Sequence, residues 1–250
     1  MQQKRYLESV FLREAPPRGE YYSALPAIRY LSEGQRLFFP ADVTFFVGEN
    51  GTGKSTLLEA IAVAAGFNAE GGTRNFHFST AATHSGLHEY LNLSRGAYPR
   101  DGFFLRAESV YNVATEIDRM DAEPSFGAPV LASYGGVSLH EQSHGESFLA
   151  IVQNRFGGQG LYLLDEPEAA LSPTRQLALL TLLHDLAKQN SQFIIATHSP
   201  ILMAYPGACI YQFSQQGIAR TAYRDTEHYR LTRRFLNDPD SMLRILFEEE

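Results

Sequence analysis

Cysteine, basic side chains and long apolar runs are all scarce in this sequence. Cys209 is the only cysteine among the 250 residues, so the chain can form no internal disulfide, which is typical of a reducing compartment. Acidic residues outnumber Lys and Arg by 28 to 21, and the net charge of −7 argues against a dedicated nucleic-acid binder. A local basic patch that binds nucleic acid stays open as an alternative.

No apolar run approaches the roughly 20 residues that a membrane-spanning helix needs. The first residues also lack the apolar stretch of a secretory signal. We therefore expect a cytoplasmic protein, and no membrane partner is indicated. Repeats, low-complexity tracts and sustained heptads are absent from the sequence as well.

What the sequence does contain is an alternation of short apolar segments with helical ones, which predicts an α/β fold with a mostly parallel sheet. Strands are predicted at 6–12, 36–39, 43–47, 103–108, 161–164 and 192–196, with a hairpin at 209–213 and 218–223. Helices are predicted at 54–65, 109–118 and 145–156, and from Ser172-Pro173 onward. We expect a single domain over 1–250, with a core of about 1–66 and 160–225, an inserted helical subdomain of about 67–159, and a helical tail of about 226–250.

The stretch GENGTGKST, residues 48–56, follows the apolar run VTFFV and precedes a predicted helix. It fits the phosphate-loop pattern G-x-x-x-x-G-K-[ST], whose glycines let backbone N–H groups converge on phosphate oxygens at a helix N-terminus. Lys54 would reach the β- and γ-phosphates and Ser55 would ligate Mg²⁺. The alternative, a Gly-rich turn with an exposed lysine, leaves the flanking strand and helix unexplained. The predicted nucleotide-binding residues are Gly48, Asn50, Gly51, Thr52, Gly53, Lys54, Ser55 and Thr56.

In the stretch LYLLDEPEAALSP, residues 161–173, an apolar strand is followed directly by two carboxylates, those of Asp165 and Glu166. The carboxyl end of a strand is where an open α/β sheet places ligand chemistry. There we expect Asp165 to hold Mg²⁺ and Glu166, as a catalytic base, to orient and deprotonate a water molecule. Alternatively, the stretch is an acidic passage from strand to loop without chemistry.

This stretch resembles the Walker B motif and D-loop of ABC-type ATPases, in which four apolar residues are followed by DEP, two residues and ALD. Ser172 stands where the family has the D-loop aspartate. The later stretch QFIIATHSP resembles the family's switch segment, so the resemblance implies that the catalytic residue His198 contacts the γ-phosphate. The alternative is a hydrogen-bonded histidine at a strand end.

The family's glutamine at the junction of core and helical subdomain is missing, because no glutamine occurs from 54 to 141. The substitute that we expect near the metal is Glu108, which follows the predicted strand 103–108. The aromatic residue that stacks on adenine stays open among Tyr21, Tyr22 and Tyr30. His84 and His88 stand four residues apart in polar sequence, and we expect them on a solvated face.

The stretch LHEQSHGESFLA, residues 139–150, has two interpretations. His140-Glu141-x-x-His144 is the H-E-x-x-H pattern of zinc proteases, which requires an unbroken helix through both histidines. Gly145 and the S-x-x-E pattern of Ser143 and Glu146 instead predict a helix that begins here. The segment then resembles the ABC signature, commonly LSGGQ, and we expect nucleotide contacts from Ser143 and Gly145 in place of zinc. A capping box without any ligand contact is a further alternative.

In motif order, the resemblance extends over about 6–213 and is to small stand-alone ATPases of the ABC superfamily, related to RecF and to structural-maintenance-of-chromosomes heads. Such relatives bind two ATP molecules between two head-to-tail subunits. The resemblance therefore implies an ATP-dependent homodimer in which Ser143 and Gly145 of one copy face Lys54 of the other. It implies hydrolysis of ATP with Mg²⁺, coupled to an unnamed process such as nucleic-acid maintenance. The alternatives are a transporter ATPase subunit and a non-catalytic dimerisation switch.

Overall fold

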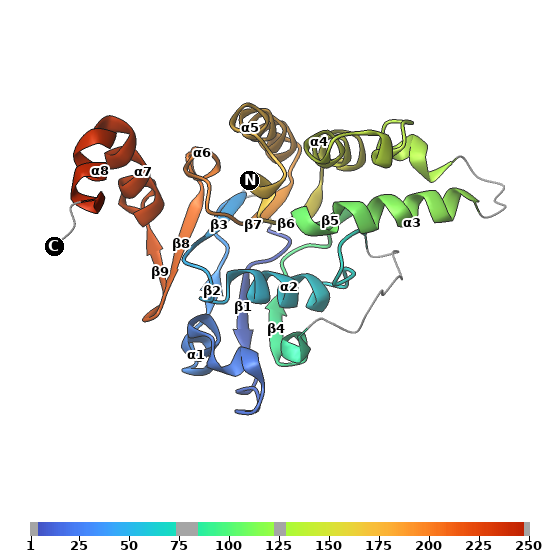
Figure 1. Ribbon diagram of the computed structural model, residues 1–250. Helices are drawn as coiled ribbons and strands as arrows, with labels where there is room; N and C mark the ends of the chain where they lie inside the picture. The colour runs from blue at the N-terminus through green and yellow to red at the C-terminus, as the bar shows by residue number, and fades with distance from the viewer. Residues whose placement is uncertain (1–4, 74–84, 123–128, 248–250) are drawn as a thin grey trace.

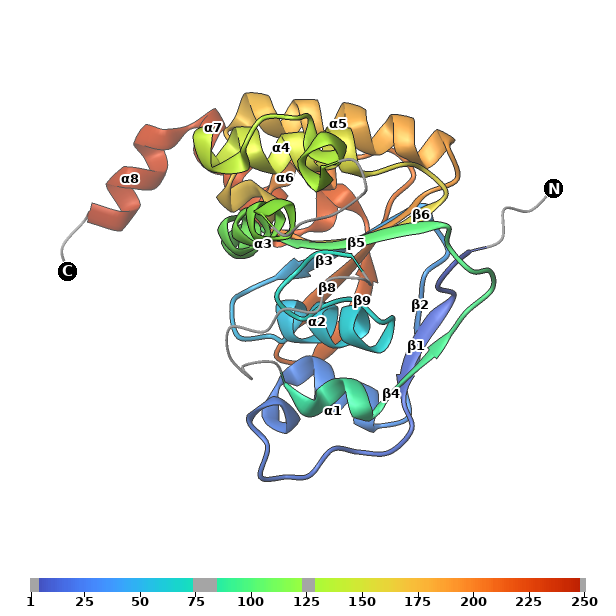
Figure 2. The same ribbon diagram turned by 90° about the vertical axis from the view of Figure 1, so that its right-hand side faces the viewer.

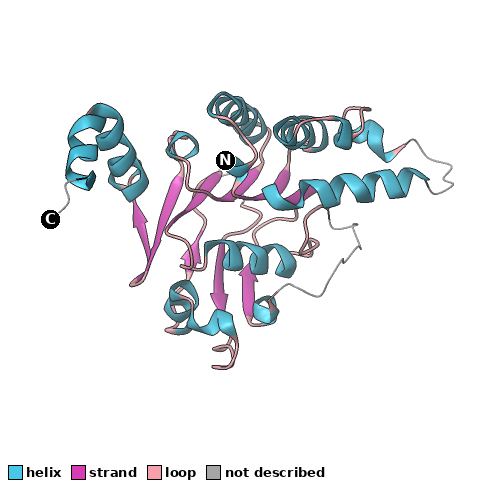
Figure 3. Ribbon diagram, in the orientation of Figure 1, coloured by secondary structure: helices cyan, strands magenta, loops and turns pink. Residues whose placement is uncertain are grey.

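The computed structural model describes residues 5–73, 85–122 and 129–247, and within them it contains two β-sheets (Figure 1 and Figure 3). The main sheet has the spatial order β5 (Asp101–Arg106), β6 (Gly160–Asp165), β7 (Gln192–Ala196), β3 (Val43–Gly48), β8 (Cys209–Ser214) and β9 (Gly217–Thr221). Its neighbouring strands are parallel except for the hairpin of β8 and β9. The smaller, antiparallel sheet has the order β2 (Leu37–Phe38), β1 (Ser9–Leu12) and β4 (Leu91–Ser94). The predicted α/β fold, mostly parallel with an antiparallel portion, is confirmed.

Different helices cover the two faces of the main sheet, as Figure 2 shows. One face carries α3 (Val110–Ala122), α4 (His144–Arg155), α5 (Pro173–Lys188) and α6 (Pro200–Met203), and the other carries α1 (Pro26–Ser32) and α2 (Lys54–Ala64) together with the smaller sheet. Successive side chains of a strand point to opposite faces. In β3, Phe45 therefore packs with the first set of helices and Phe46 with the second.

For the range 67–159 the sequence predicts an inserted, more helical subdomain, and the described parts of this range contain two strands. β5 pairs with β6 in the main sheet, and β4 pairs with β1 in the smaller one. The α-helices in its described parts are α3 and α4, which cover one face of the main sheet. β4 was not predicted, because four residues within turn-rich sequence are too few for a periodic pattern. The domain boundaries themselves stay a prediction.

The helical tail predicted from residue 226 consists of α7 (Glu227–Asn237) and α8 (Pro239–Phe247). Neither helix has a buried residue, and Figure 1 shows both beyond β9, at one end of the molecule. Thr226 is fully buried and caps α7, because its side chain accepts the backbone N–H of Tyr229. Among the described residues, the helices are all too short or too polar to cross a membrane.

The junction of β3 and the phosphate loop requires a glycine. Gly48 has a φ of +137°, and a Cβ at this position would lie 2.1 Å from the carbonyl oxygen of Phe213 in β8. We expect Gly48→Ala to lower the free energy of unfolding by roughly 2–4 kcal/mol, measured by urea denaturation. Gly51→Ala is the matched control, because its φ is +77° but no atom lies within 4 Å of its Cβ. It should lose only about 1–2 kcal/mol, and equal losses would contradict the role of the close approach.

Candidate functional site

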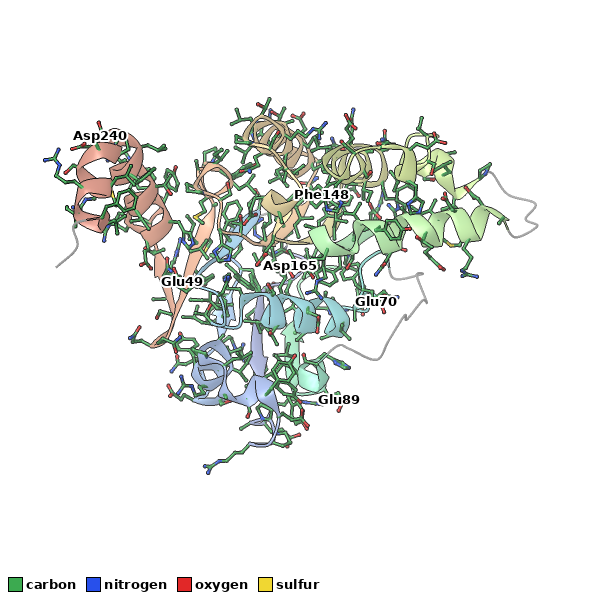
Figure 4. All side chains as sticks on the ribbon, viewed as in Figure 1. Glu49, Glu70, Glu89, Phe148, Asp165 and Asp240 are labelled. Carbon is green, nitrogen blue, oxygen red and sulfur yellow. The ribbon has the colours of Figure 1, made fainter. Side chains whose placement is uncertain are left out.

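Three neighbouring parallel strands end at the same edge of the main sheet. In the register of the sheet, Asp165 at the end of β6 pairs with Ala196 at the end of β7, and Ala196 pairs with Phe46 of β3. The phosphate loop, Asp165-Glu166 and Thr197-His198 therefore follow adjacent strands, although they are far apart in the sequence. Figure 4 labels Asp165 near the middle of the view, just above α2. This edge is where an open α/β sheet places its ligands.

The phosphate loop holds the lysine of its motif in a buried position. The Nζ of Lys54, at the first position of α2, donates to the carbonyl oxygens of Gly48 and Glu49 at 2.8 and 3.0 Å. Burial lowers the pKa of Lys54, and the carboxylates that follow β6 act against this shift. The ammonium group thus lies within the loop at the N-terminus of α2, where the helix dipole also favours an anion.

A hydrogen bond joins the beginning of α2 to the end of β6, because the hydroxyl of Ser55 donates to Oδ1 of Asp165 at 2.8 Å. Arg106, the last residue of β5, lies at the other carboxylate oxygen, with its Nε 3.4 Å from Oδ2. The Nη1 of Arg106 also lies 2.8 Å from Oε2 of Glu59 on α2. Burial raises the pKa of Asp165 to about 6, although Arg106 and Ser55 act to lower it. The partners of Asp165 therefore do not fully offset the burial of its charge.

The oxygen atoms of Ser55 and Asp165 fit a magnesium ion. Mg²⁺ binds hard oxygen ligands and commonly takes one or two from the protein, with the rest from phosphates and water. Glu108, the predicted third ligand, is exposed on a 3₁₀ turn, Ala107–Ser109, and its charge contributes to the raised pKa of Asp165. The direct contact is made by Arg106, which the sequence analysis did not single out. A role of Glu108 at the metal stays a prediction.

Glu166 adopts a backbone conformation that is uncommon for a residue with a side chain. Its φ of 48° and ψ of 52° lie in the left-handed region. The N–H of Glu166 donates to the carbonyl oxygen of Ala196 at 2.9 Å, which holds the turn against β7. The side chain is 40% exposed, and its Oε1 lies 3.7 Å from Nε2 of His198. Backbone strain of this kind is concentrated at functional sites, and here it keeps an accessible carboxylate beside a histidine.

Glu168 connects the turn after β6 to the end of β7. Its carboxylate accepts hydrogen bonds from the hydroxyl of Thr197, at 2.7 Å, and from the backbone N–H of His198. The Nδ1 of His198 lies 3.0 Å from Nε2 of His228, in the first turn of α7. Burial, the ammonium of Lys54 and the ring of His228 lower the pKa of His198 to about 4. The imidazole of His198 is therefore uncharged near neutral pH.

Sequence reasoning missed Glu168 and His228 as members of this site. Glu168 lies within the DEPEA stretch, but the motif assigns no role to that position. His228 is in the predicted tail, and no pattern in the tail connects it with the strand that ends at His198. Only the packing of α7 against the end of β7 brings the two histidines together.

The segment before α4 forms a helix N-terminus. His140 lies in a 3₁₀ turn, Leu139–Glu141, whereas His144 is the first residue of α4, so the helix that H-E-x-x-H would need is interrupted. Ser143 caps α4 and forms the predicted capping box with Glu146, whose carboxylate accepts the backbone N–H of Ser143 at 2.9 Å. The prediction that a helix begins at this point is confirmed.

The capping residues of α4 are also tied to α5. The Nη1 of Arg175 donates to Oγ of Ser143 at 3.2 Å, and its Nη2 donates to Glu146 at 2.9 Å. Gly145 is buried, and a Cβ there would lie 2.7 Å from the carbonyl oxygen of Ala170. Because α4 and α2 cover opposite faces of the main sheet, the signature-like segment and the phosphate-loop helix belong to different layers of the chain. Nucleotide contacts by Ser143 and Gly145 stay a prediction.

The residues that the sequence left unassigned are placed only in part. His84 lies outside the described residues, and the Nδ1 of His88 lies 3.2 Å from the carbonyl oxygen of Ser85. Tyr22 is buried, whereas Tyr21 is 65% exposed and packs edge-on against it. An exposed ring can stack on a base and a buried one cannot, so Tyr21 and the half-buried Tyr30 stay open as candidates.

Two parts of the chain match known protein families. Residues 26–100 match the family described as "AAA domain", and this range contains the phosphate loop. Residues 134–204 match the family described as "AAA domain, putative AbiEii toxin, Type IV TA system". This second range contains the signature-like segment, the carboxylates after β6 and the histidine after β7. The matched segments are thus those that carry the motifs.

Two curated relatives are named as import ATP-binding proteins. The ribose import ATP-binding protein RbsA of Bacillus cereus is 27% identical over 184 residues, which cover 67% of this chain and 36% of that protein. The galactose/methyl galactoside import ATP-binding protein MglA of Salmonella typhimurium is 24% identical over 213 residues, which cover 74% of this chain and 40% of that protein. The chain therefore spans well under half the length of these two relatives.

Among solved structures, "An inward-facing conformation of a putative metal-chelate type ABC transporter" aligns with a TM-score of 0.52 at 19% sequence identity. The alignment covers 92% of this chain and 88% of that chain. Because it extends over nearly the whole of both chains, the similarity is one of overall fold.

The buried charge of Asp165 should cost stability. Because its folded-state pKa is raised from 3.8 to about 6, the cost is present in full above that value and absent once both states are protonated. We expect Asp165→Asn to raise the free energy of unfolding at pH 7.5 by on the order of 1–3 kcal/mol. The gain should disappear below about pH 4, as followed by urea denaturation across this range.

Ser55→Ala is the matched control for this measurement, because it removes a hydrogen bond that favours the ionised form of Asp165. It should lower stability at pH 7.5 where Asp165→Asn raises it. A loss of stability in Asp165→Asn at pH 7.5 would contradict the interpretation of Asp165 as an incompletely compensated buried charge.

Proposed function

We propose that this chain, an AAA-type protein with the P-loop fold of ABC-type ATPases, hydrolyses ATP to ADP and phosphate with Mg²⁺. The observation that carries the proposal is the hydrogen bond of 2.8 Å between Ser55 and Asp165, which joins the phosphate-loop helix to the strand that ends in the acidic pair. We propose ATP as the nucleotide because RbsA and MglA, two of the curated relatives, are named as ATP-binding proteins.

Binding of the phosphate chain uses groups that are already in place. The Nζ of Lys54 donates to two carbonyl oxygens of the loop, and it can exchange them for phosphate oxygens, which carry more negative charge. The backbone N–H groups at the N-terminus of α2 add their partial positive charge. Ser55 and Asp165 would hold the Mg²⁺ ion, which when bound supplies positive charge to the phosphate oxygens.

Hydrolysis requires a base for water and a donor near the γ-phosphate. Glu166 would accept a proton from water as its oxygen attacks the γ-phosphorus and ADP leaves. His198, 3.7 Å from the Glu166 carboxylate, would hold the water or a γ-phosphate oxygen with an uncharged ring. The carboxylate of Glu168 accepts the backbone N–H of His198, and this hydrogen bond fixes the position of the backbone that carries the imidazole.

The signature-like segment would act in a second copy of the chain. Ser143 is exposed at the N-terminus of α4, a helix of twelve residues whose positive dipole end suits a phosphate. α4 and α2 cover opposite faces of the main sheet. We therefore propose a head-to-tail homodimer in which Ser143 and Gly145 of one copy complete the site at Lys54 of the other.

An ATPase subunit of a membrane importer is the second candidate, because RbsA and MglA are named as import ATP-binding proteins. A nucleic-acid maintenance factor is supported by the basic side chains of α7, which include Arg230, Arg233 and Arg234. Turnover with and without DNA and RNA, together with pull-down of membrane proteins, distinguishes the two. Stimulation by nucleic acid favours the maintenance factor, and a stable membrane partner favours the importer.

Substitution of the catalytic base should separate binding from turnover. We expect the Glu166→Gln variant to bind ATP and to accumulate as a dimer when ATP is present. Its rate of ATP turnover should fall by about 100-fold or more. The measurements are phosphate release and mass in solution with ATP. Lys54→Ala is the control, because it should lose nucleotide binding itself. Unchanged turnover in Glu166→Gln would remove this residue from the mechanism, and negligible turnover in the natural sequence would leave a non-catalytic switch.

Mixing two inactive variants tests the head-to-tail dimer. Glu166→Gln removes the base, and Ser143→Glu places a negative charge where the partner's γ-phosphate would lie. Each variant alone should be inactive. In a mixed dimer one of the two composite sites has both natural residues, so an equimolar mixture should regain part of the turnover. A mixture that stays inactive, while mixed dimers form, would show that Ser143 does not act across a dimer.

A further inference from the structure

His198 and His228 form a pair of imidazoles that belong to different parts of the chain. The Nδ1 of His198 lies 3.0 Å from the Nε2 of His228, and the ring centroids are 5.1 Å apart. A hydrogen bond at this distance requires that one nitrogen carries the proton and the other accepts it. Among the described residues, the remaining ring nitrogens, Nε2 of His198 and Nδ1 of His228, are buried without a hydrogen-bond partner.

The surroundings of His198 decide which ring donates. If Nδ1 of His198 carried the proton, its Nε2 would present a lone pair to the carboxylate of Glu166, 3.7 Å away, and two acceptors would face each other. If His228 donates from Nε2, then His198 carries its proton on Nε2, and an N–H faces the same carboxylate. The second arrangement is electrostatically favourable. Burial lowers the pKa of both rings and the charge of Lys54 acts in the same direction, whereas Glu49 acts against it. The net shifts favour the uncharged form of each ring.

The chain is anchored just before His228, although α7 itself has no buried residue. Thr226, two residues before it, is fully buried, and its hydroxyl donates to the carbonyl oxygen of Tyr223 at 2.8 Å. The same side chain caps α7, and therefore determines the direction of its first turn. A cleft of about 670 Å³ is lined by His198 and Glu168 on one side and by residues of α7 on the other. The first turn of α7 thus borders the site directly.

We propose that His228 is a positioning residue for His198: by donating its Nε2 proton to Nδ1 of His198, it holds the proton of His198 on Nε2 and directs that N–H toward the phosphate or water beside Glu166. Nε2 of His198, which has no hydrogen-bond partner among the described residues, is then a donor available to a ligand. In this way helix α7, which no motif connects with the nucleotide, supplies a part of the site. The role in turnover rests on the proposed ATP hydrolysis, whereas the tautomer of His198 does not.

The tautomer is measured first, on the protein without nucleotide. Long-range ¹H–¹⁵N spectra of the histidine rings distinguish a proton on Nε2 from one on Nδ1. We expect His198 to carry its proton on Nε2 and to accept at Nδ1 from His228. A His198 that carries its proton on Nδ1 overturns the proposal. This result is independent of any enzymatic activity.

Kinetics test the consequence for turnover. His228→Leu fills the space without a donor, and we expect kcat to fall on the order of 10-fold, less than the ~100-fold for loss of a direct donor, with KM for ATP nearly unchanged. His228→Gln places an amide N–H at a similar reach and should restore most of the rate. His184→Leu, on α5 and near Tyr205, is the matched control and should leave kcat unchanged.

A double-mutant cycle separates positioning from a general structural effect. In a His198→Ala background, His228→Leu should cost no further rate, because the residue through which it acts is gone. An equal loss in both backgrounds overturns the proposal. If the natural protein hydrolyses no ATP, the proposed function is refuted, and the tautomer of His198 alone decides the inference.

Discussion

The hydrogen bond between the hydroxyl of Ser55 and the carboxylate of Asp165 is the contact on which the rest of the site depends. It joins the N-terminus of α2, which presents positive partial charge, to the end of β6, which presents negative charge. Arg106 and Glu59 form a second connection between the same elements. The raised pKa of Asp165 indicates that these partners only partly offset the free-energy cost of burying its charge. Such an incompletely compensated carboxylate is suited to bind a cation, because a metal ion adds the positive charge that the neighbouring side chains do not fully provide.

The site is possible because the main sheet keeps its apolar side chains on the two faces and leaves its carboxyl edge for polar groups. Phe45 and Phe46 of β3 point to opposite layers, so neither competes for space at the edge. Short hydrogen-bonded turns then stabilise each polar group. Glu166 is held in a left-handed conformation by the carbonyl of Ala196, and Glu168 ties the same turn to the end of β7. The parallel register of β3, β7 and β6 therefore determines both the packing of the sheet faces and the positions of Glu166 and Glu168.

Much of this arrangement follows from local patterns. The loop around Lys54, the acidic residues after β6 and the histidine after β7 each stand in a short motif next to an apolar strand, and such strands end at a common edge in a parallel sheet. The start of α4 at Ser143 was also predictable, because a capping box is a local interaction between residues three apart. β4 was not predictable, since its four residues form a strand only by pairing with β1. Contacts of Arg106 and His228 depend on which strand lies next to β6 and on where α7 packs, and neither is encoded within a few neighbouring residues.

The sequence by itself determined four features: the phosphate loop, the acidic pair, the switch-like histidine, and the alternation of strands and helices. Each of these depends on residues that are close to one another along the chain. The tertiary structure alone decided that Arg106 neighbours Asp165 and that His228 lies within hydrogen-bond distance of His198. It also decided that α2 and α4 cover opposite faces of the sheet. The physical reason is that local patterns follow from backbone geometry and burial along the chain, whereas contacts between distant segments follow from the packing of whole layers.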